Sequence, residues 1–304
     1  MQIERKGEWM ELTLPDQWAG FSIETILRDV WKVPKKMVHQ FRMNKLVTIN
    51  GETVSWLKEL QAGEKLQVRF FTKDAYGVIP NYFDLDVLYE DDHLLIVNKP
   101  AGMDTHPNEP NQEGTLANAV AYHYLSNGIE TKVRHIHRLD KETTGAVIFA
   151  KHAVAGAILD RLLEQRAIKR TYMALLHGKL KKQAGIIDEP IGRDRHHATR
   201  RRVSPKGQAA VTHYEVINYE KQDDTTLVKV QLQTGRTHQI RVHMSYIGHP
   251  LVGDTLYGGS SSLPRQALHA TKIVLPHPIT AQQIECFAPP LDEPPIFEYD
   301  MMNI

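Results

Sequence analysis

Segments of strand length outnumber segments of helical periodicity in this chain, and the two kinds do not alternate regularly. Short apolar or alternating runs, which are typical of strands, occupy residues 94–97, 146–150, 171–176, 211–216, 227–232 and 273–275. Helical spacing of apolar residues is found at 116–124, at Val154, Ile158 and Leu162, and at Ile240, Met244 and Ile247. Because strands and helices do not alternate, the pattern predicts an α+β fold with a largely antiparallel central sheet and flanking helices, not a doubly wound sheet.

Residues 15–72 predict a small α/β module that precedes this fold. Apolar residues between Phe21 and Trp31 stand at three- and four-residue steps, and Pro34 is suited to open a second short helix. Strand-like runs follow at 46–50 and 65–70, and the first ends at Asn50-Gly51, a dipeptide typical of hairpin turns. Glycine, proline and asparagine then mark 73–84 as a linker. We therefore expect the second domain to span residues 85–300.

The overall charge of the chain does not indicate a polyanion-binding protein. Its 304 residues carry a formal net charge of +1, so any nucleic acid must be met by local clusters of basic side chains. Two such clusters occur, although either alone is also typical of a solvated loop. They comprise Lys35, Lys36, Arg42 and Lys45 in the first module, and Arg193, Arg195, Arg200, Arg201, Arg202 and Lys206 in the second domain.

Two further features bear on where the protein works. No apolar run approaches the length of a membrane span, and the first residues lack the apolar core of a signal peptide, so we expect a cytoplasmic protein. The single cysteine, Cys286, cannot form an internal disulfide, which agrees with that expectation. Its neighbourhood predicts a small core residue and not a reactive thiol.

Two polar segments that border predicted strands contain candidate site residues. Lys99 directly follows the strand at 94–97, where it could contact phosphate or cap the turn. Asp140 lies in a polar, glycine-closed turn just before the strand at 146–150. A carboxylate in such a turn is presented to a substrate more readily than it is buried, so Asp140 is the first candidate for a catalytic residue.

A third polar segment follows the strand at 227–232. Gly235 ends that strand, and the hydroxyl of Thr237 is suited to cap a helix that begins there. Arg241 would then lie about one turn into the helix, on the same side as Thr237 and His238. An arginine in this place could bind a carboxylate bidentately and hold it ionised.

Other site chemistries find less support in the sequence. His135, His137 and Asp140 have a spacing similar to that of metal ligands, but Lys141 follows and would repel a divalent ion. The Gly-x-Ser-x-Gly elbow of a serine hydrolase does not occur. Neither does a glycine-rich phosphate loop or a dinucleotide fingerprint. The sequence therefore predicts a site that uses neither a metal ion nor an organic cofactor.

Four motifs, in order along the chain, resemble those of the RluA-type RNA pseudouridine synthases. They are Tyr89-Glu90-Asp91-Asp92-His93-Leu94-Leu95-Ile96-Val97-Asn98-Lys99-Pro100-Ala101-Gly102, His137-Arg138-Leu139-Asp140-Lys141-Glu142-Thr143-Thr144-Gly145, Lys169-Arg170-Thr171-Tyr172 and Gly235-Arg236-Thr237-His238-Gln239-Ile240-Arg241. The resemblance covers about residues 85–290. The module at 15–72 is similar, more loosely, to the S-four-type RNA-binding domain that often precedes this catalytic domain.

The resemblance implies that the protein isomerises uridine to pseudouridine in RNA. That reaction breaks the glycosidic bond and joins C5 of the same uracil to C1′ of the ribose. Asp140 would be the catalytic carboxylate, by attack on C1′ or by promoting a glycal. Tyr172 would stack on the flipped uracil and could help to remove the C5 proton, and Arg241 would pair with Asp140. Arg138 would fill the gap that the flipped uridine leaves.

Further expectations concern the RNA and its contacts. Ribosomal RNA is the expected substrate and transfer RNA the runner-up, with a monomer as the acting species. A non-catalytic RNA-binding or ribosome-assembly protein that kept the fold is the alternative from a different class. Thr144 stands where the family commonly has serine, and because a hydroxyl is retained we expect adjusted packing only. The expected RNA contacts are Arg138, Lys35, Lys36, Arg42, Lys45, Lys99, Arg200, Arg201, Arg202 and Arg236.

Overall fold

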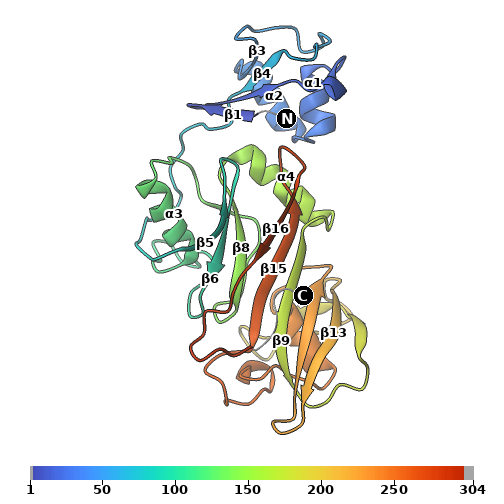
Figure 1. Cartoon of the computed structure of the whole chain (residues 1–304). Helices are drawn as coiled ribbons and strands as arrows, with labels where there is room; N and C mark the ends of the chain where they lie inside the picture. The colour runs from blue at the N-terminus through green and yellow to red at the C-terminus, as the bar shows by residue number, and fades with distance from the viewer. Residues whose placement is uncertain (1–2, 298–304) are drawn as a thin grey trace.

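The computed structural model describes residues 3–297 and consists of an N-terminal module joined to a larger domain. The module lies at one end of the molecule, and the long strands of the larger domain run away from it (Figure 1). Within residues 3–297, no helix has the length and apolar character needed to cross a membrane.

A four-stranded sheet in the order β1-β2-β4-β3 forms the module together with short helical segments, among them the 3-10 helix Asp16–Trp18. Helix α1 continues directly into one π-helical stretch, and α2 follows Pro34 as predicted. Asn50 and Gly51 both have positive φ and form the predicted tight turn after β3. The elements are β1 (Ile3–Lys6), β2 (Trp9–Thr13), α1 (Ile23–Thr25), the π-helical stretch Ile26–Val30, α2 (Lys35–Met43), β3 (Val47–Ile49) and β4 (Lys65–Val68).

The module begins earlier than the predicted residue 15. Strand β2 pairs with β4 from Met10 to Thr13, so the first hairpin belongs to the sheet. The alternation of buried and exposed residues that identifies a strand is absent there, because Glu11 and both of its neighbours are buried. Lys6 and Gln67 donate hydrogen bonds to its carboxylate, at 2.7 and 2.9 Å. These partners offset the cost of burying a charge.

Ten strands form the central sheet of the larger domain, along the path β10-β13-β14-β9-β15-β8-β6-β5, with β16 beside β15 and β7 beside β8. Within the described residues, β8 and β15 are the one parallel pair. The predicted α+β fold with a largely antiparallel sheet is therefore confirmed. The strands are β5 (Asp86–Glu90), β6 (Leu94–Lys99), β7 (Arg134–His135), β8 (Thr144–Ala150), β9 (Lys169–His177), β10 (Ala184–Asp188), β13 (Val211–Glu220), β14 (Thr225–Leu232), β15 (Leu268–Pro276) and β16 (Gln283–Phe287).

Helices cover both faces of this sheet. Alternate residues of β6 and β8 belong to two different hydrophobic clusters, which is why these strands are apolar throughout. Helices α3 (Leu116–Ser126) and α5 (Gln239–Tyr246) contribute to one cluster, and α4 (Ala153–Glu164) contributes to the other. A separate small hairpin, β11 (Ile191–Arg193) with β12 (Arg201–Val203), overlaps the basic cluster of the second domain.

The module and the larger domain share a hydrophobic core at α4. Val154 and Ile158 of this helix pack in the same cluster as the module's apolar side chains. The indole Nε1 of Trp31 donates to the carbonyl of Ile279 at 3.1 Å. The predicted linker at 73–84 has no helix or strand, and the amide of Val133 donates to the carbonyl of Tyr76 within it at 2.9 Å. The linker is therefore bound to the larger domain along its path.

Helix α5 begins at Gln239, so its N-cap lies one residue after the predicted cap at Thr237. Its N-cap is His238, which has a left-handed backbone (φ 58°) and makes no side-chain cap. Gln239 takes over the organising role, because its Oε1 accepts hydrogen bonds from Thr234 Oγ1 and from the amide of Arg236, at 2.8 and 3.0 Å. The left-handed residue turns the His238 side chain toward the Asp140 loop.

Candidate active site

The Asp140 loop joins β7 to β8 and is fixed on both sides of the aspartate. Thr105 binds the main chain of Leu139 twice, donating to its carbonyl at 2.9 Å and accepting from its amide at 3.1 Å. The amide of Thr143 donates to the carbonyl of Asp140 at 3.0 Å. Gly145 has φ 112°, and a Cβ there would lie 2.3 Å from the carbonyl oxygen of Ala270. Only glycine therefore allows β8 to approach β15 so closely behind the loop.

Lys99 is not available to RNA, contrary to its predicted role as a phosphate contact. The residue is fully buried, and its ammonium donates to the carbonyls of Pro100, Met103 and Lys141, at 2.8, 2.7 and 2.9 Å. Burial lowers the pKa of Lys99 to about 7. The side chain of Lys99 turns inward and not toward the solvent. Its hydrogen bond to the carbonyl of Lys141 ties the Asp140 loop to β6.

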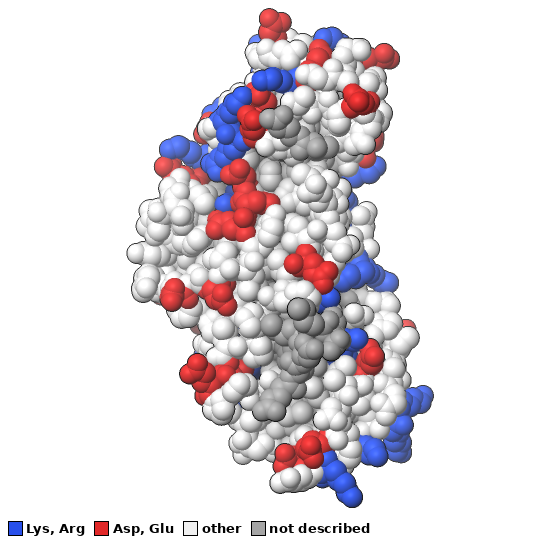
Figure 2. All heavy atoms as spheres, viewed as in Figure 1, with Lys and Arg blue, Asp and Glu red and all other residues white. Residues whose placement is uncertain are grey.

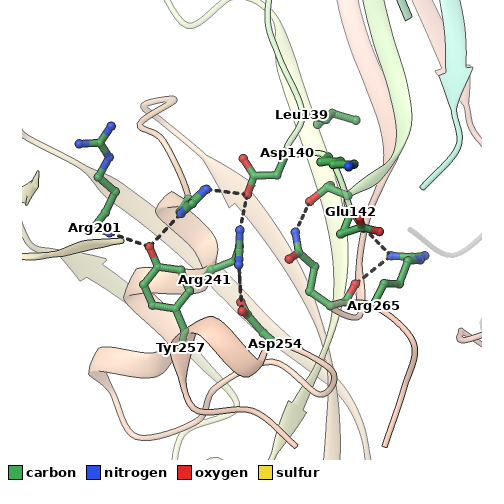
Figure 3. A network of polar contacts seen from close by, with 12 residues as sticks. Leu139, Asp140, Glu142, Arg201, Arg241, Asp254, Tyr257 and Arg265 are labelled. Atoms are coloured by element: carbon green, nitrogen blue, oxygen red, sulfur yellow. Dashed lines mark hydrogen bonds and ion pairs between the residues drawn. The ribbon is translucent and has the colours of Figure 1, made fainter. Parts of the chain in front are cut away.

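Arg241 is buried and binds two carboxylates at once. Its Nη1 donates to Asp140 Oδ2 at 3.0 Å, while Nε and Nη2 donate to Asp254 at 2.7 and 2.9 Å (Figure 3). Burial by itself would lower the pKa of Arg241. The hydrogen bonds to Asp254 and the negative charge of Asp140 outweigh this effect, so the pKa of Arg241 is raised. The sequence predicted the partnership of Arg241 with Asp140, and the structure brings the two together from loop and helix.

Two aromatic side chains complete this network. Tyr257, from the 3-10 helix Thr255–Tyr257, lies with its ring 5.0 Å from the guanidinium carbon of Arg241. Its Oη lies 2.9 Å from His238 Nδ1 and accepts a hydrogen bond from the amide of Arg201 at 2.8 Å. On the other side of its ring, His238 Nε2 is 3.8 Å from Asp140 Oδ2. The guanidinium of Arg241 and the imidazole of His238 therefore both face Oδ2 of Asp140.

A cleft of about 1080 Å³ opens above this network. Asp140, Tyr172 and Arg241 all line it, and the side chain of Asp140 remains 25% exposed. Tyr172 is buried in the β9 strand beneath, and burial raises its pKa, so the phenol is protonated at neutral pH. Arg170 also lines the cleft, and its buried Nε has no partner within residues 3–297. The volume is sufficient for a nucleoside and neighbouring groups.

Three of the predicted RNA contacts lie at this cleft. Arg138, Arg201 and Arg236 line it, and Arg138 is exposed. The Nε of Arg236 donates to the carbonyl of Ala209 at 3.0 Å, which fixes the base of that side chain. Arg201 is the first residue of β12, so the β11–β12 hairpin lies beside the cleft.

The other predicted contacts lie outside the cleft. Arg200 and Arg202 are exposed at the β11–β12 hairpin, whereas Lys35, Lys36 and Lys45 are exposed on the module. Arg42 pairs with Glu24 and lies over the ring of Trp56 at 4.8 Å. On the face drawn in Figure 2, basic and acidic side chains are interspersed over a mostly uncharged surface.

The histidines with metal-like spacing and the single cysteine pack against other parts of the protein. His137 is buried, and its Nε2 accepts a hydrogen bond from the amide of Ile148 at 3.4 Å. His135 lies against His106, with ring centroids 4.8 Å apart. Among residues 3–297, no group of three or more His, Cys, Asp and Glu side chains is placed to hold a metal ion. Cys286 is buried in β16, and burial raises its pKa to about 11.

Thr144 keeps the hydroxyl that the family's serine would supply. Its Oγ1 lies 2.8 Å from His269 Nδ1 and accepts a hydrogen bond from Arg265 Nη2 at 3.1 Å. The extra methyl group is buried in the same place. The threonine therefore takes part in the packing between β8 and β15 directly behind the Asp140 loop.

The comparison with protein families decides the class of the protein. Residues 93–246 match the family described as RNA pseudouridylate synthase, and this range contains Asp140, Tyr172 and Arg241. The chain belongs to this family. Residues 10–66 match the RluD ribosomal pseudouridine synthase N-terminal domain, which confirms a family module at the start of the chain. The protein is thus an RluA-type pseudouridine synthase, an isomerase that acts on RNA.

Curated relatives match nearly the whole chain. Bacillus subtilis YhcT, described as an uncharacterized RNA pseudouridine synthase, is 47% identical over 303 residues, which covers 99% of this chain and 98% of YhcT. The ribosomal large subunit pseudouridine synthase D of Nitrosomonas europaea is 40% identical over 287 residues, with 90% of this chain and 82% of that protein covered. The similarity therefore includes the N-terminal module as well as the cleft.

A solved structure supports the fold. The human RNA pseudouridylate synthase domain containing 1 is 27% identical, with a TM-score of 0.58, over 68% of this chain and 83% of that chain. The predicted fold class and the predicted enzyme class are both confirmed by these comparisons.

Proposed function

We propose that this synthase isomerises uridine in ribosomal RNA of the large subunit, with Asp140 as its catalytic carboxylate. The relative from Nitrosomonas europaea that carries the ribosomal name covers 90% of this chain and therefore spans both the module and the cleft. The observation that carries the catalytic part is the placement of Asp140, which stands partly exposed in the cleft and is held through one of its two oxygens.

The hydrogen bonds of Asp140 leave one oxygen for the substrate. Arg241 donates to Oδ2, and His238 faces the same atom. No hydrogen bond to Oδ1 is found within residues 3–297. An ionised carboxylate with one free oxygen can attack C1′ of the ribose or remove a ribose proton on the way to a glycal. Both routes then rejoin C5 of the uracil to C1′.

Retention of the detached uracil depends on the rest of the cleft. Tyr172 offers a buried aromatic face with a protonated phenol, which can stack on the uracil and take part in removal of the C5 proton. Arg138 is exposed at the same cleft, so its planar cation can occupy the space left in the RNA when the uridine flips out. No cofactor is required by this chemistry.

Docking of the RNA would use groups from both parts of the chain. Arg200, Arg201 and Arg202 lie at the hairpin beside the cleft, and the basic residues of the N-terminal module supply a second contact region. Since one chain carries both regions and a complete cleft, we propose that a monomer is the acting species. A ribosomal RNA substrate also implies a cytoplasmic location.

The substrate can be identified by mapping pseudouridines in a strain that lacks this gene. Ribosomal and transfer RNA from the deletion strain, its parent and a strain complemented with the intact gene would be compared. We expect one or a few pseudouridines of large-subunit ribosomal RNA to disappear and to return on complementation. Loss confined to transfer RNA would contradict the ribosomal assignment. An unchanged map in all stable RNA would favour the non-catalytic alternative.

A further inference from the structure

Tyr257 connects the arginine hairpin to the catalytic aspartate. The residue is buried and lies 16 positions after Arg241, the end of the nearest of the four sequence motifs. Its hydroxyl contacts the main chain of Arg201 on strand β12 and the imidazole of His238 at the start of α5, at 2.8 and 2.9 Å. Its ring covers the guanidinium of Arg241. One side chain thus touches the hairpin and both groups that face Asp140 Oδ2 (Figure 3).

The hydrogen bonds of Tyr257 decide which nitrogen of His238 carries the proton. A main-chain amide can only donate, so the amide of Arg201 uses a lone pair of Tyr257 Oη. The hydroxyl hydrogen then has His238 Nδ1 as its acceptor within residues 3–297. An Nδ1 that accepts has no hydrogen of its own, and a neutral imidazole must therefore carry its proton on Nε2.

The protonated nitrogen faces the catalytic group. His238 Nε2 is 3.8 Å from Asp140 Oδ2, the oxygen to which Arg241 Nη1 also donates. An N–H at this place attracts the carboxylate and keeps its other oxygen turned to the cleft. In the opposite tautomer a nitrogen lone pair would face the carboxylate and repel it. The Tyr257 hydroxyl therefore selects between an attractive and a repulsive neighbour for Asp140.

We propose that Tyr257 is a positioning residue of the synthase, which acts through His238. It fixes the Nε2–H tautomer of His238, and thereby the orientation of Asp140, and it does so only while β12 supplies the amide of Arg201. The hairpin that carries the exposed Arg200 and Arg202 is thus joined to the orientation of the catalytic carboxylate by one hydroxyl. This inference rests on the proposed role of Asp140.

The test combines two substitutions that keep the shape of the site. Tyr257→Phe retains the ring over Arg241 and removes only the hydroxyl. His238→Gln places an amide N–H near the position of Nε2, and this donor does not depend on a tautomer. We expect Tyr257→Phe to lower the single-turnover rate at saturating RNA by roughly tenfold to a hundredfold, similar to the loss of an outer hydrogen-bond partner of a metal ligand. The Kd for RNA should stay within about twofold, because no RNA-contacting group is lost.

The double variant separates positioning from general loss of structure. In the His238→Gln background, Tyr257→Phe should cause no further loss of rate, since its effect passes through the tautomer of His238. Tyr246→Phe, an exposed tyrosine at the end of α5, serves as the matched control and should react like the parent. A parental rate for Tyr257→Phe, or losses that multiply in the double variant, would overturn the inference while leaving the proposed function intact. A parent enzyme that forms no pseudouridine would overturn both.

Discussion

Arg241 Nη1 donates a hydrogen bond to Asp140 Oδ2 at 3.0 Å, across 101 positions of the chain. The Nε and Nη2 atoms of the same guanidinium donate to Asp254, whose side chain is almost fully buried. Asp254 therefore orients the arginine, and the arginine orients Asp140. This order of dependence, from a buried carboxylate to a partly exposed one, leads to the first prediction.

Asp254→Asn should lower both the stability and the rate of the enzyme. An asparagine retains one acceptor, but its amide hydrogens would face the donor Nη2 or Nε of Arg241. We expect a loss of about 2 kcal/mol in the free energy of unfolding, as for one hydrogen bond to a charged group. The turnover rate should fall by roughly tenfold or more, with the RNA affinity retained. Urea unfolding and single-turnover kinetics measure the two effects. Asp223→Asn, in an exposed turn, is the control, and equal behaviour of the two variants would contradict the account.

Lys99→Met should lower the free energy of unfolding of the enzyme without weakening its electrostatic attraction for RNA. Methionine fills a similar volume but leaves the carbonyls of Pro100, Met103 and Lys141 without the donor they share. We expect a loss of about 2–4 kcal/mol in the free energy of unfolding. The exposed Lys141→Met in the same loop should change it by less than about 0.5 kcal/mol. A stable Lys99→Met protein whose RNA affinity depends less on salt would support the phosphate contact that the structure argues against.

Arg202→Ala should weaken RNA binding in a manner that depends on salt. The side chain is exposed on β12, next to the cleft-lining Arg201. If it neutralises one phosphate, the slope of log K against log salt should fall in magnitude by about 0.7 to 0.9. Binding titrations at several salt concentrations measure this slope. Lys221→Ala, in the exposed turn between β13 and β14, should leave it unchanged. The same reduction in both variants would indicate a general charge effect and not a docking site at the hairpin.

Acid should destabilise the junction between the module and the larger domain. His93 Nδ1 and His152 Nε2 are 2.9 Å apart, and Phe70 of the module stacks on His152. Burial lowers the pKa of His93 to about 4 and that of His152 well below its ordinary value. In the unfolded chain both titrate near pH 6.5. Between pH 6.5 and 4 the unfolded state therefore binds more protons, and the free energy of unfolding falls as the pH falls.

The size of this effect can be measured by urea unfolding at pH 7.5 and pH 5. Each buried histidine contributes up to about 1.4 kcal/mol per pH unit. His152→Asn keeps an N-cap side chain for α4 but removes one titrating group, so its stability should fall less steeply with acid. His196→Asn, at an exposed position, should follow the parent. An equally steep fall for His152→Asn would contradict the assignment.

The sequence predicts the central sheet well because its strands are apolar on both faces or alternate clearly. Strands β6 and β8 are examples of the first kind and β14 of the second. The first hairpin is not predictable from the sequence, because Glu11 is buried with its own charged partners, which no pattern of hydrophobicity can indicate. The exact start of α5 differs from the prediction because the side chain of Gln239, not that of the favoured cap residue Thr237, accepts the hydrogen bonds of the turn.

The candidate site divides in the same way. Asp140, Tyr172 and Arg241 stand in recognisable motifs, and the structure brings all three to one cleft. Asp254 and Tyr257 come from an irregular stretch around a 3-10 helix, where the sequence has no periodicity to interpret. One signal was present: a buried arginine requires more than one partner to satisfy its donors. The role of Lys99 depended on the direction of its side chain, which sequence alone does not give.

The central claim is that Asp140 performs the chemistry and does not serve to bind RNA. Purified parent and Asp140→Asn proteins can be compared by release of tritium from [5-³H]uridine in ribosomal RNA, together with the Kd for the same RNA. The account predicts no detectable release by Asp140→Asn and an affinity within about threefold of the parent, since the change is isosteric and removes no RNA-contacting cation. Tritium release by Asp140→Asn at a rate near that of the parent would contradict it.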